Sequence, residues 1–215
     1  MTRVDPTPQS RHASAPGALN TRPPTRVGSA AIALFFVVMA LITVSIAAPG
    51  VAAIGAFRTL PKLGLSLPDY TAYAGSESAV MGRIAAGMVM QPVFQMSMQA
   101  TLLLSFGALV AWILSQIGGA VTPRRGITRM TNVAIVLLCS LSLGALFQAD
   151  ALRSELGAYL EQARAGDKVG AESRREVFDR RHRAAERLNG VQFATALAAV
   201  AMAGLSLLPR RGSVP

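Results

Sequence analysis

Three glutamines, Gln91, Gln95 and Gln99, follow one another at intervals of four residues within an apolar part of the chain. This spacing places them on one face of a helix. An amide that faces lipid costs several kcal/mol for each unsatisfied group, so this glutamine face must meet protein or a wet cavity. Its functional interpretation is a polar pathway or ligand cleft. The structural interpretation is hydrogen bonding to polar residues of other helices: Asn132, Gln148, Asn189 or Gln192.

Other residue types point to metal chemistry less well. Thioethers bind Cu(I), and four methionines lie close together, but residues two apart on a helix face different ways. No His or Cys accompanies them, so we interpret Met88, Met90, Met96 and Met98 as core filling. A haem inside the bundle would need two intramembrane histidines, whereas the chain has only His12 and His182. We therefore expect no cofactor.

One ionisable pair lies beside an apolar segment. Asp150 comes after a long uncharged stretch, and Arg153 comes three residues later, so we predict an ion pair at the membrane edge, with a proton relay as the alternative. The single Cys139 lies within that stretch, which excludes an intrachain disulfide. Paired catalytic carboxylates, a glycine-rich phosphate loop and a nucleophile elbow are absent from the sequence, so we do not expect an enzyme.

The composition indicates the environment in which these residues act. Of 215 residues, 52% are hydrophobic and only 15% are charged, against about 25% charged in soluble domains. The long uncharged stretches that result from this deficit favour an integral membrane protein. The net charge of +10 is dispersed and is not interleaved with aromatic residues, so we expect contacts with the bilayer and anionic lipid head groups and none with nucleic acid.

A membrane-spanning helix needs about 20 apolar residues. Four stretches meet this length, at about 30–48, 93–117, 130–149 and 188–208, and predict an all-α membrane protein with a four-helix transmembrane bundle over 27–209. Pro49-Gly50 should break or bend the first span. That span exceeds the usual length of a cleaved signal sequence, so we expect it to be retained.

The remaining segments are polar. Residues 1–26 predict a disordered basic tail, and 210–215 a short basic tail. Residues 150–187 mix nine basic with eight acidic residues at helical spacing, which predicts a polar helical hairpin between the third and fourth helices. An even number of spans puts both termini on one side. The short basic turn at 123–129 favours the cytoplasmic side of the cell membrane.

Small residues also recur on two predicted spans. Gly190, Ala194 and Ala198 lie four apart, as do Ser140 and Gly144. Such stripes allow helices to approach closely in lipid. We interpret them as packing surfaces, which would also allow copies of the chain to associate.

The segment before the last span has a recognisable pattern. Phe178-x3-His182-x2-Ala185-x2-Leu188-Asn189 resembles the F-x3-H-x2-S-x2-L-N signature of a four-helix membrane family of unknown function, whose vertebrate members are called transmembrane protein 205. Further similarities are Ala48-Pro49, Phe57-x2-Leu60-Pro61 and Gly82-Arg83. Ala185 replaces the serine of the signature. The resemblance implies four helices and makes Phe178, His182 and Asn189 candidate functional positions.

Taken together, these observations favour a non-enzymatic structural or interaction protein of the bilayer. A small transporter or permeation path lined by the glutamine face is the alternative. A copper- or haem-binding membrane protein is disfavoured by the shortage of histidines.

Overall fold

A computed structural model of the chain describes residues 24–121 and 125–208. In these ranges the four long helices are α1 (Arg26–Thr59), α3 (Ser78–Ile117), α4 (Arg125–Arg164) and α5 (Lys168–Leu207). The connection from α1 to α3 contains two 3-10 turns, η1 (Leu60–Lys62) and η2 (Pro68–Tyr70), and one helical turn, α2 (Thr71–Ala74). Each long helix is long and apolar enough to cross a bilayer, which confirms the predicted all-α, multi-pass architecture.

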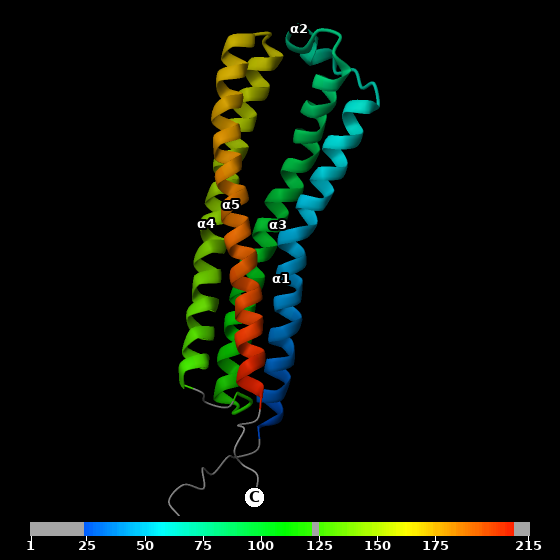
Figure 1. The fold of residues 1–215 in the computed structure, drawn as a ribbon. Coiled ribbons are helices and arrows are strands. Elements are labelled where there is room, and N and C mark those ends of the chain that lie inside the picture. The colour runs from blue at the N-terminus through cyan, green and yellow to red at the C-terminus, as the bar shows by residue number, and fades with distance from the viewer. Residues whose placement is uncertain (1–23, 122–124, 209–215) are drawn as a thin grey trace, which may run out of the picture.

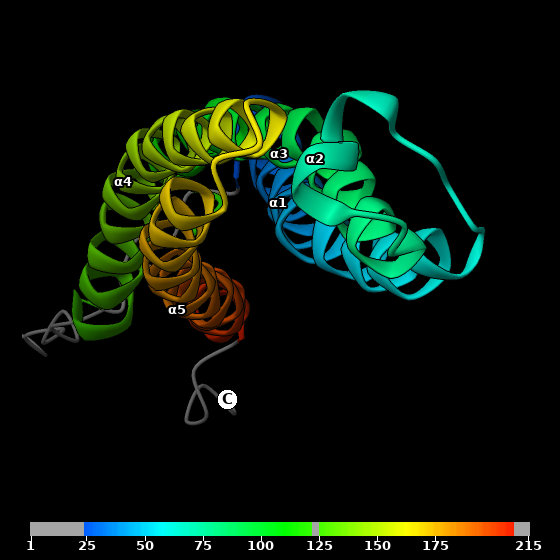
Figure 2. The same ribbon diagram turned by 90° about the horizontal axis from the view of Figure 1, so that it is seen from above.

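The helices form two antiparallel hairpins. α1 pairs with α3 and α4 pairs with α5, while α3 contacts α4 less extensively and α1 barely meets α5. Seen from above, the order α5, α4, α3, α1 makes a curved row (Figure 2). In the side view the hairpins lie close together where α1 begins and α5 ends, and they spread apart toward the opposite end (Figure 1). We call these the terminal end and the arm end.

The helix ends are fixed by local signals. Thr25 caps α1 by accepting a hydrogen bond from the Gly28 N–H, and its own N–H and hydroxyl both donate to the Gly118 carbonyl at the end of α3. A Cβ on Gly28 would lie only 2.5 Å from that carbonyl oxygen, so glycine is required for this contact. At the arm end, Gly166 has φ +76° and Asp167 caps α5. The predicted polar hairpin is thereby confirmed.

Of the two outcomes predicted at Pro49, a break or a bend, the break is wrong, because α1 runs through this residue without interruption. Proline lacks the N–H that would bond the carbonyl four residues earlier, which is that of Ser45. The Ser97 hydroxyl of α3 donates to the Ser45 carbonyl instead. A side chain of the partner helix therefore replaces the missing backbone donor.

The main core lies toward the terminal end, where all four long helices meet. Phe35 of α1 packs on Trp112 of α3 with ring centroids 5.2 Å apart, and both side chains are buried. α4 contributes Ile135 and Leu138, and α5 contributes buried alanines. A second, smaller cluster at the arm end joins η2, α3, α4 and α5 through Tyr70, Ile84, Ala163 and Ala171.

The small-residue stripes do not pack inside the chain as expected. Gly190, Ala194 and Ala198 are exposed, and so are Ser140 and Gly144. The buried face of α5 points in a different direction from that stripe. It carries Gln192, Ala196, Ala199 and Ala203, which are spaced by three or four residues. This is the spacing of a helix-pairing seam.

Charged residues limit the uncharged part of each helix in the second hairpin. On α4 the stretch between Arg129 and Asp150 spans about 30 Å, the thickness of the hydrocarbon core. On α5 the uncharged stretch begins at Leu188 and continues to the end of the helix. Large apolar side chains such as Val133, Val136 and Leu197 point outward here, as expected against lipid. The predicted tail residues 1–23 and 210–215 lie outside the described residues.

The substitution of Pro49 by a residue with an N–H tests the contact with Ser97. We expect Ser97→Ala to lower the free energy of unfolding by about 1–3 kcal/mol, because it leaves the Ser45 carbonyl without a donor. In a Pro49→Ala background the same substitution should cost little, because the backbone donor is restored. A double-mutant cycle from thermal unfolding in detergent measures this coupling. Equal costs in both backgrounds would exclude it.

The matched control is Ser140→Ala. The Ser140 hydroxyl is exposed and bonds only to the Val136 carbonyl of its own helix. Its loss should leave the unfolding temperature nearly unchanged in either background.

Candidate functional site

A cluster of polar side chains lies inside the apolar part of the bundle, where α3, α4 and α5 meet. Thr101 and Ser105 come from α3, Ser142 from α4 and Gln192 from α5, and all four are at most 1% exposed. Cys139, one turn before Ser142, is buried beside them. We call these five residues the polar cluster. Because the four polar side chains are almost fully buried, they form hydrogen bonds with groups of the protein.

The cluster is connected by short hydrogen bonds. The Gln192 amide donates from Nε2 to the Ser142 Oγ at 2.7 Å, and the Ser142 and Ser105 hydroxyl oxygens lie 2.9 Å apart. The carbonyls of Thr101 and Leu138 provide acceptors for these hydroxyls, at 2.7 and 2.8 Å. The chain of contacts joins the two hairpins, because Ser105 belongs to one and Ser142 with Gln192 to the other.

Two atoms of the cluster have no hydrogen-bond partner. They are the Thr101 Oγ1 and the Gln192 Oε1, both buried. An unsatisfied polar atom of this kind costs about 1–3 kcal/mol. Both oxygens can accept a hydrogen bond, and the Thr101 hydroxyl can also donate one. The two oxygens can therefore each take one further hydrogen bond, but they are neutral and supply no acid or base.

A second polar contact lies nearer the terminal end. The Asn132 Oδ1 of α4 accepts hydrogen bonds from the Trp112 Nε1 at 2.6 Å and from the Gln116 Nε2 at 3.2 Å, both on α3. The sequence predicted Asn132 as a hydrogen-bonding partner for another helix. Asn132 does bond to α3, but its partners there are Trp112 and Gln116 and not the glutamine face.

The glutamine face lies at a different level from the polar cluster. Gln95 is half-buried, and its Oε1 is 3.5 Å from the Arg153 guanidinium of α4. Gln91 is also half-buried, and Gln99 is exposed. Because Arg153 follows the last uncharged turn of α4, Gln95 lies at the edge of the apolar belt. The face thus meets a charged neighbour, and the amides do not converge on one another.

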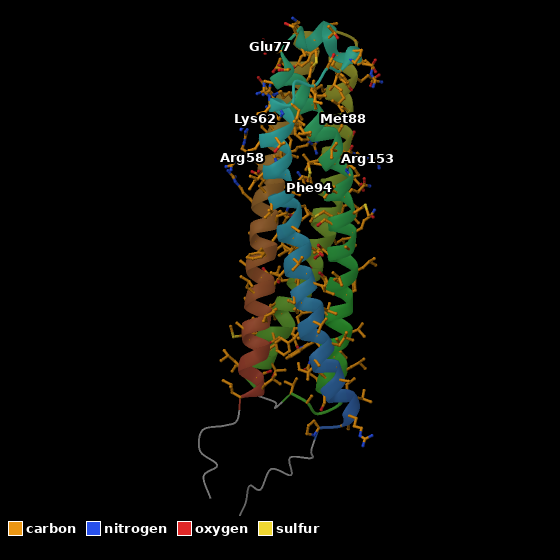
Figure 3. All side chains as sticks on the ribbon, turned by 90° about the vertical axis from the view of Figure 1, so that its right-hand side faces the viewer. Arg58, Lys62, Glu77, Met88, Phe94 and Arg153 are labelled. Carbon is orange, nitrogen blue, oxygen red and sulfur yellow. The ribbon has the colours of Figure 1, made fainter. Side chains whose placement is uncertain are left out.

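The predicted membrane-edge pair has a different geometry. Among the described residues, Arg153 contacts Gln95, and it makes no ion pair with Asp150. Asp150 itself is exposed. Figure 3 shows Arg153 at about the level of Arg58, which projects from α1 on the other side of the molecule. Cations from both hairpins therefore mark this edge of the bundle.

The residues on which the family resemblance rests lie at two places in the fold. The rings of Phe178 and His182 stack with centroids 5.6 Å apart, and the His182 Nε2 lies 3.3 Å from the Glu186 Oε1. Asn189 is half-buried one turn further along α5. Gly82 packs on Pro61 so closely that a Cβ would lie 2.4 Å from the Pro61 Cα. The structure thus brings together two of the segments on which the resemblance rests.

Ion pairs hold the two helices of the polar hairpin together. The Glu155 side chain, 16% exposed, lies 3.7 Å from the Arg174 Nη1 and 3.4 Å from the Arg181 Nε. Tyr73 of α2 donates a hydrogen bond to Glu172, and burial together with this bond raises the pKa of the Tyr73 phenol. Arg164 reaches Asp69 at 3.6 Å and lies over the Tyr70 ring. These contacts tie the α1–α3 connection to the hairpin.

The methionines do not form a common site. Met90 and Met98 are buried, Met88 is half-buried and Met96 is 70% exposed, so their sulfur atoms are distributed around α3. In the described part of the chain, no three His, Cys, Asp or Glu side chains are placed to share a metal ion.

Sequence reasoning missed the serines of the polar cluster, since Ser105 and Ser142 are small and isolated in their spans. One signal was available. Within the span of α5 the buried positions read Gln192, Ala196, Ala199, Ala203 and Ser206, so a glutamine occupies a position in a seam that otherwise holds small residues. A polar residue in a helix-pairing seam indicates a buried partner.

Comparison with known proteins adds no relative. No family model, no curated protein and no solved structure matches this chain. The function of this chain is therefore inferred from its residues and their geometry.

Substitutions at Gln192 should distinguish lost hydrogen bonding from lost volume. We expect Gln192→Ala to lower the free energy of unfolding by about 1–3 kcal/mol or more, because it removes a donor and leaves space. Gln192→Leu keeps most of the volume and removes the unsatisfied oxygen, so its cost should stay below about 1.5 kcal/mol.

Cys139 provides the measurement. It is the only cysteine of the chain, and its Sγ lies 3.4 Å from the Ser105 carbonyl. Labelling by N-ethylmaleimide in membranes should accelerate in Gln192→Ala and remain slow in Gln192→Leu. Equal acceleration in both variants would show that the hydrogen bond to Ser142, and not the volume of the Gln192 side chain, keeps the seam closed.

Proposed function

We propose that this chain is a non-enzymatic interaction protein of the bilayer. In this proposal the four spans anchor it, and the polar hairpin at 150–187, hereafter the charged arm, presents exposed arginines to an acidic partner outside the hydrocarbon. α4 and α5 are continuous from the apolar belt into this arm. The arm therefore has a defined direction relative to the membrane, which a flexible loop would lack.

The observation that carries the proposal is a set of arginines that the fold does not use. Arg180, Arg183 and Arg187 are spaced by three and four residues, so they share one face of α5. All three are exposed, and among the described residues none makes a hydrogen bond or ion pair. The arm's own pairing uses other residues, chiefly Glu155 with Arg174 and Arg181.

Exposed arginines at this spacing suit a partner that carries carboxylates or phosphates. A guanidinium binds such groups through two parallel hydrogen bonds, and hydrogen bonds to charged groups each contribute about 1.5–3 kcal/mol. Electrostatic attraction from a row of like charges also speeds encounter with an acidic surface.

The alternative of a permeation path rests on the glutamine face. Gln95 faces Arg153 across α3 and α4. A polar solute that moved along this face would pass a cation at the membrane edge, so an anionic solute would be favoured. Substitution of Gln95 distinguishes this alternative from the interaction role.

We further propose that both chain ends lie in the cytoplasm. The short turn at 123–129, on the terminal side, carries three basic residues and no acidic residue. Short loops with an excess of Lys and Arg stay in the cytoplasm. The resemblance to the transmembrane protein 205 family implies the same number of spans and, because that family is of unknown function, points to no particular activity.

Neutralising the arm arginines tests the main proposal. With a photo-crosslinking residue at the exposed position Ala184, the yield of adducts to a protein in native membranes should fall at least tenfold in R180Q/R183Q/R187Q, because three charge-assisted contacts are lost. The thermal stability should remain near that of the parent. R58Q/K62Q/R83Q, three exposed cations of the other hairpin, is the matched control and should keep the adducts.

The permeation alternative predicts that function depends on Gln95 and not on the arginines of the charged arm. The two variants are each expressed in a strain that lacks this chain. If the charged arm carries the function, Gln95→Leu should restore the parental phenotype, and R180Q/R183Q/R187Q should not restore it. Failure of Gln95→Leu alone, with a normally folded protein, would favour the permeation path and contradict the interaction role.

The orientation is tested with single cysteines in a Cys139→Ser background. Ser76→Cys and Ser173→Cys are exposed at the arm end, and Gly126→Cys is exposed at the terminal end. A membrane-impermeant maleimide on intact cells should label the first two and reach the third only after lysis. Labelling of Gly126→Cys alone would reverse the orientation. Labelling of all three would contradict four spans.

A further inference from the structure

The outer face of the α4–α5 pair carries an apolar groove within the membrane belt. The groove has a volume of about 410 Å³ and is lined mainly by Met130, Val133, Ala134, Leu137, Ala198 and Met202. The small side chains Ala134 and Ala198 lie between larger ones, which gives the groove its depth. Ala198 belongs to the small-residue stripe that the sequence assigned to packing and that lies exposed in the fold.

One end of the groove is charged. Arg129, at the terminal end of α4, is among its lining residues and is exposed. Among the described residues Arg129 has no ion-pair or hydrogen-bond partner. Arg129 also marks the point where the uncharged stretch of α4 begins, which is the level of the lipid head groups. The groove therefore combines an apolar surface at the depth of the hydrocarbon with a cation at the membrane surface.

We propose that this groove is a binding site for one anionic glycerophospholipid, with an acyl chain along Met130, Leu137 and Met202 and the phosphate at Arg129. The site goes beyond the proposed interaction role, because it lies on the terminal end and does not involve the charged arm. Its chemistry matches both ends of such a lipid: apolar side chains for the chain, and a guanidinium that binds phosphate through paired hydrogen bonds.

A second copy of the protein fits the groove less well. Copies inserted in the same orientation would place their terminal ends in the same leaflet. In the described part of the chain, that end carries Arg26 and Arg129, while the carboxylates, Asp69, Glu77 and those from Asp150 to Glu186, all belong to the arm end. A neighbouring copy would therefore leave Arg129 beside like charges, whereas a lipid phosphate neutralises it.

The experiment compares lipid retention by purified variants using native mass spectrometry. Protein in detergent is mixed with phosphatidylglycerol or phosphatidylcholine of equal chain length, and bound lipid is counted. The parent should retain phosphatidylglycerol preferentially. Arg129→Gln should lower that preference about fivefold, the effect of one basic residue near an anionic surface. Arg26→Gln, which removes an exposed cation of the same end away from the groove, should change it little.

A second variant tests the apolar part. Ala198→Leu fills the groove floor with a side chain that lipid-facing helices tolerate, so the unfolding temperature in phosphatidylcholine should not change. Retention of long-chain phosphatidylglycerol should decrease, and binding of a dihexanoyl analogue, which reaches only the head-group end, should not. The two results together separate chain binding from charge attraction.

Three outcomes would overturn the proposal. Equal losses in Arg129→Gln and Arg26→Gln would mean that only the overall charge attracts the lipid. Unchanged retention of long-chain lipid in Ala198→Leu would exclude the groove as the chain site. Efficient disulfide formation between copies with Ala198→Cys in a Cys139→Ser background, in native membranes, would show that a second copy covers the groove.

Discussion

The fold depends on the requirement that every polar group in hydrocarbon finds its partner within the protein. A bilayer core offers no water, so an unpaired carbonyl or amide costs several kcal/mol. The contact between α1 and α3 at Ser97 shows this requirement at one atom, because Pro49 removes a backbone donor and a side chain of the partner helix supplies another. The polar cluster meets the same requirement in part: Gln192 donates to Ser142, whose hydroxyl lies beside that of Ser105, while the Thr101 Oγ1 and the Gln192 Oε1 stay without a partner.

The two hairpins differ in the length of the uncharged stretch along their helices. On α4 the uncharged stretch ends at Asp150, about 30 Å from Arg129. On α1 it extends from Val27 to Phe57, which is about 45 Å at the same rise per residue. Val51, Ile54 and Phe57, in the last turns of this stretch, are 44–71% exposed. The α1–α3 hairpin must therefore tilt in the bilayer or draw lipid up around it, and either arrangement agrees with its divergence from the charged arm (Figure 1).

Sequence patterns predicted which segments are helical but not which faces are buried. The end of α3 at Ile117 and the turn at Gly166-Asp167 result from glycine and capping residues, whose effects are local. The buried faces could not be predicted from hydrophobic periodicity, because a helix face that meets lipid is as apolar as one that meets the protein core. Ala198 and Ala199 look alike in sequence, yet the first is exposed and the second fully buried. Gln95 and Gln192 are likewise both glutamines in apolar surroundings, and only the fold separates the membrane edge from the buried seam.

The distribution of polar groups along the bundle then depends on the hydrogen-bond partners that each level provides. Neutral side chains occupy the interior, where Ser105, Ser142 and Gln192 can pair without burying charge. Ionisable groups appear where the belt ends: Arg129 at the terminal end, and Asp150 with Arg153 at the other. The cations at both edges are more numerous than the fold's own ion pairs require, and those without partners face outward. Because a partner inside the chain is absent for Arg129 and for Arg180, Arg183 and Arg187 in the described residues, their charge is available only to molecules outside it. The two proposals therefore share one chemistry, the binding of anions by exposed guanidinium groups at the two edges of the apolar belt.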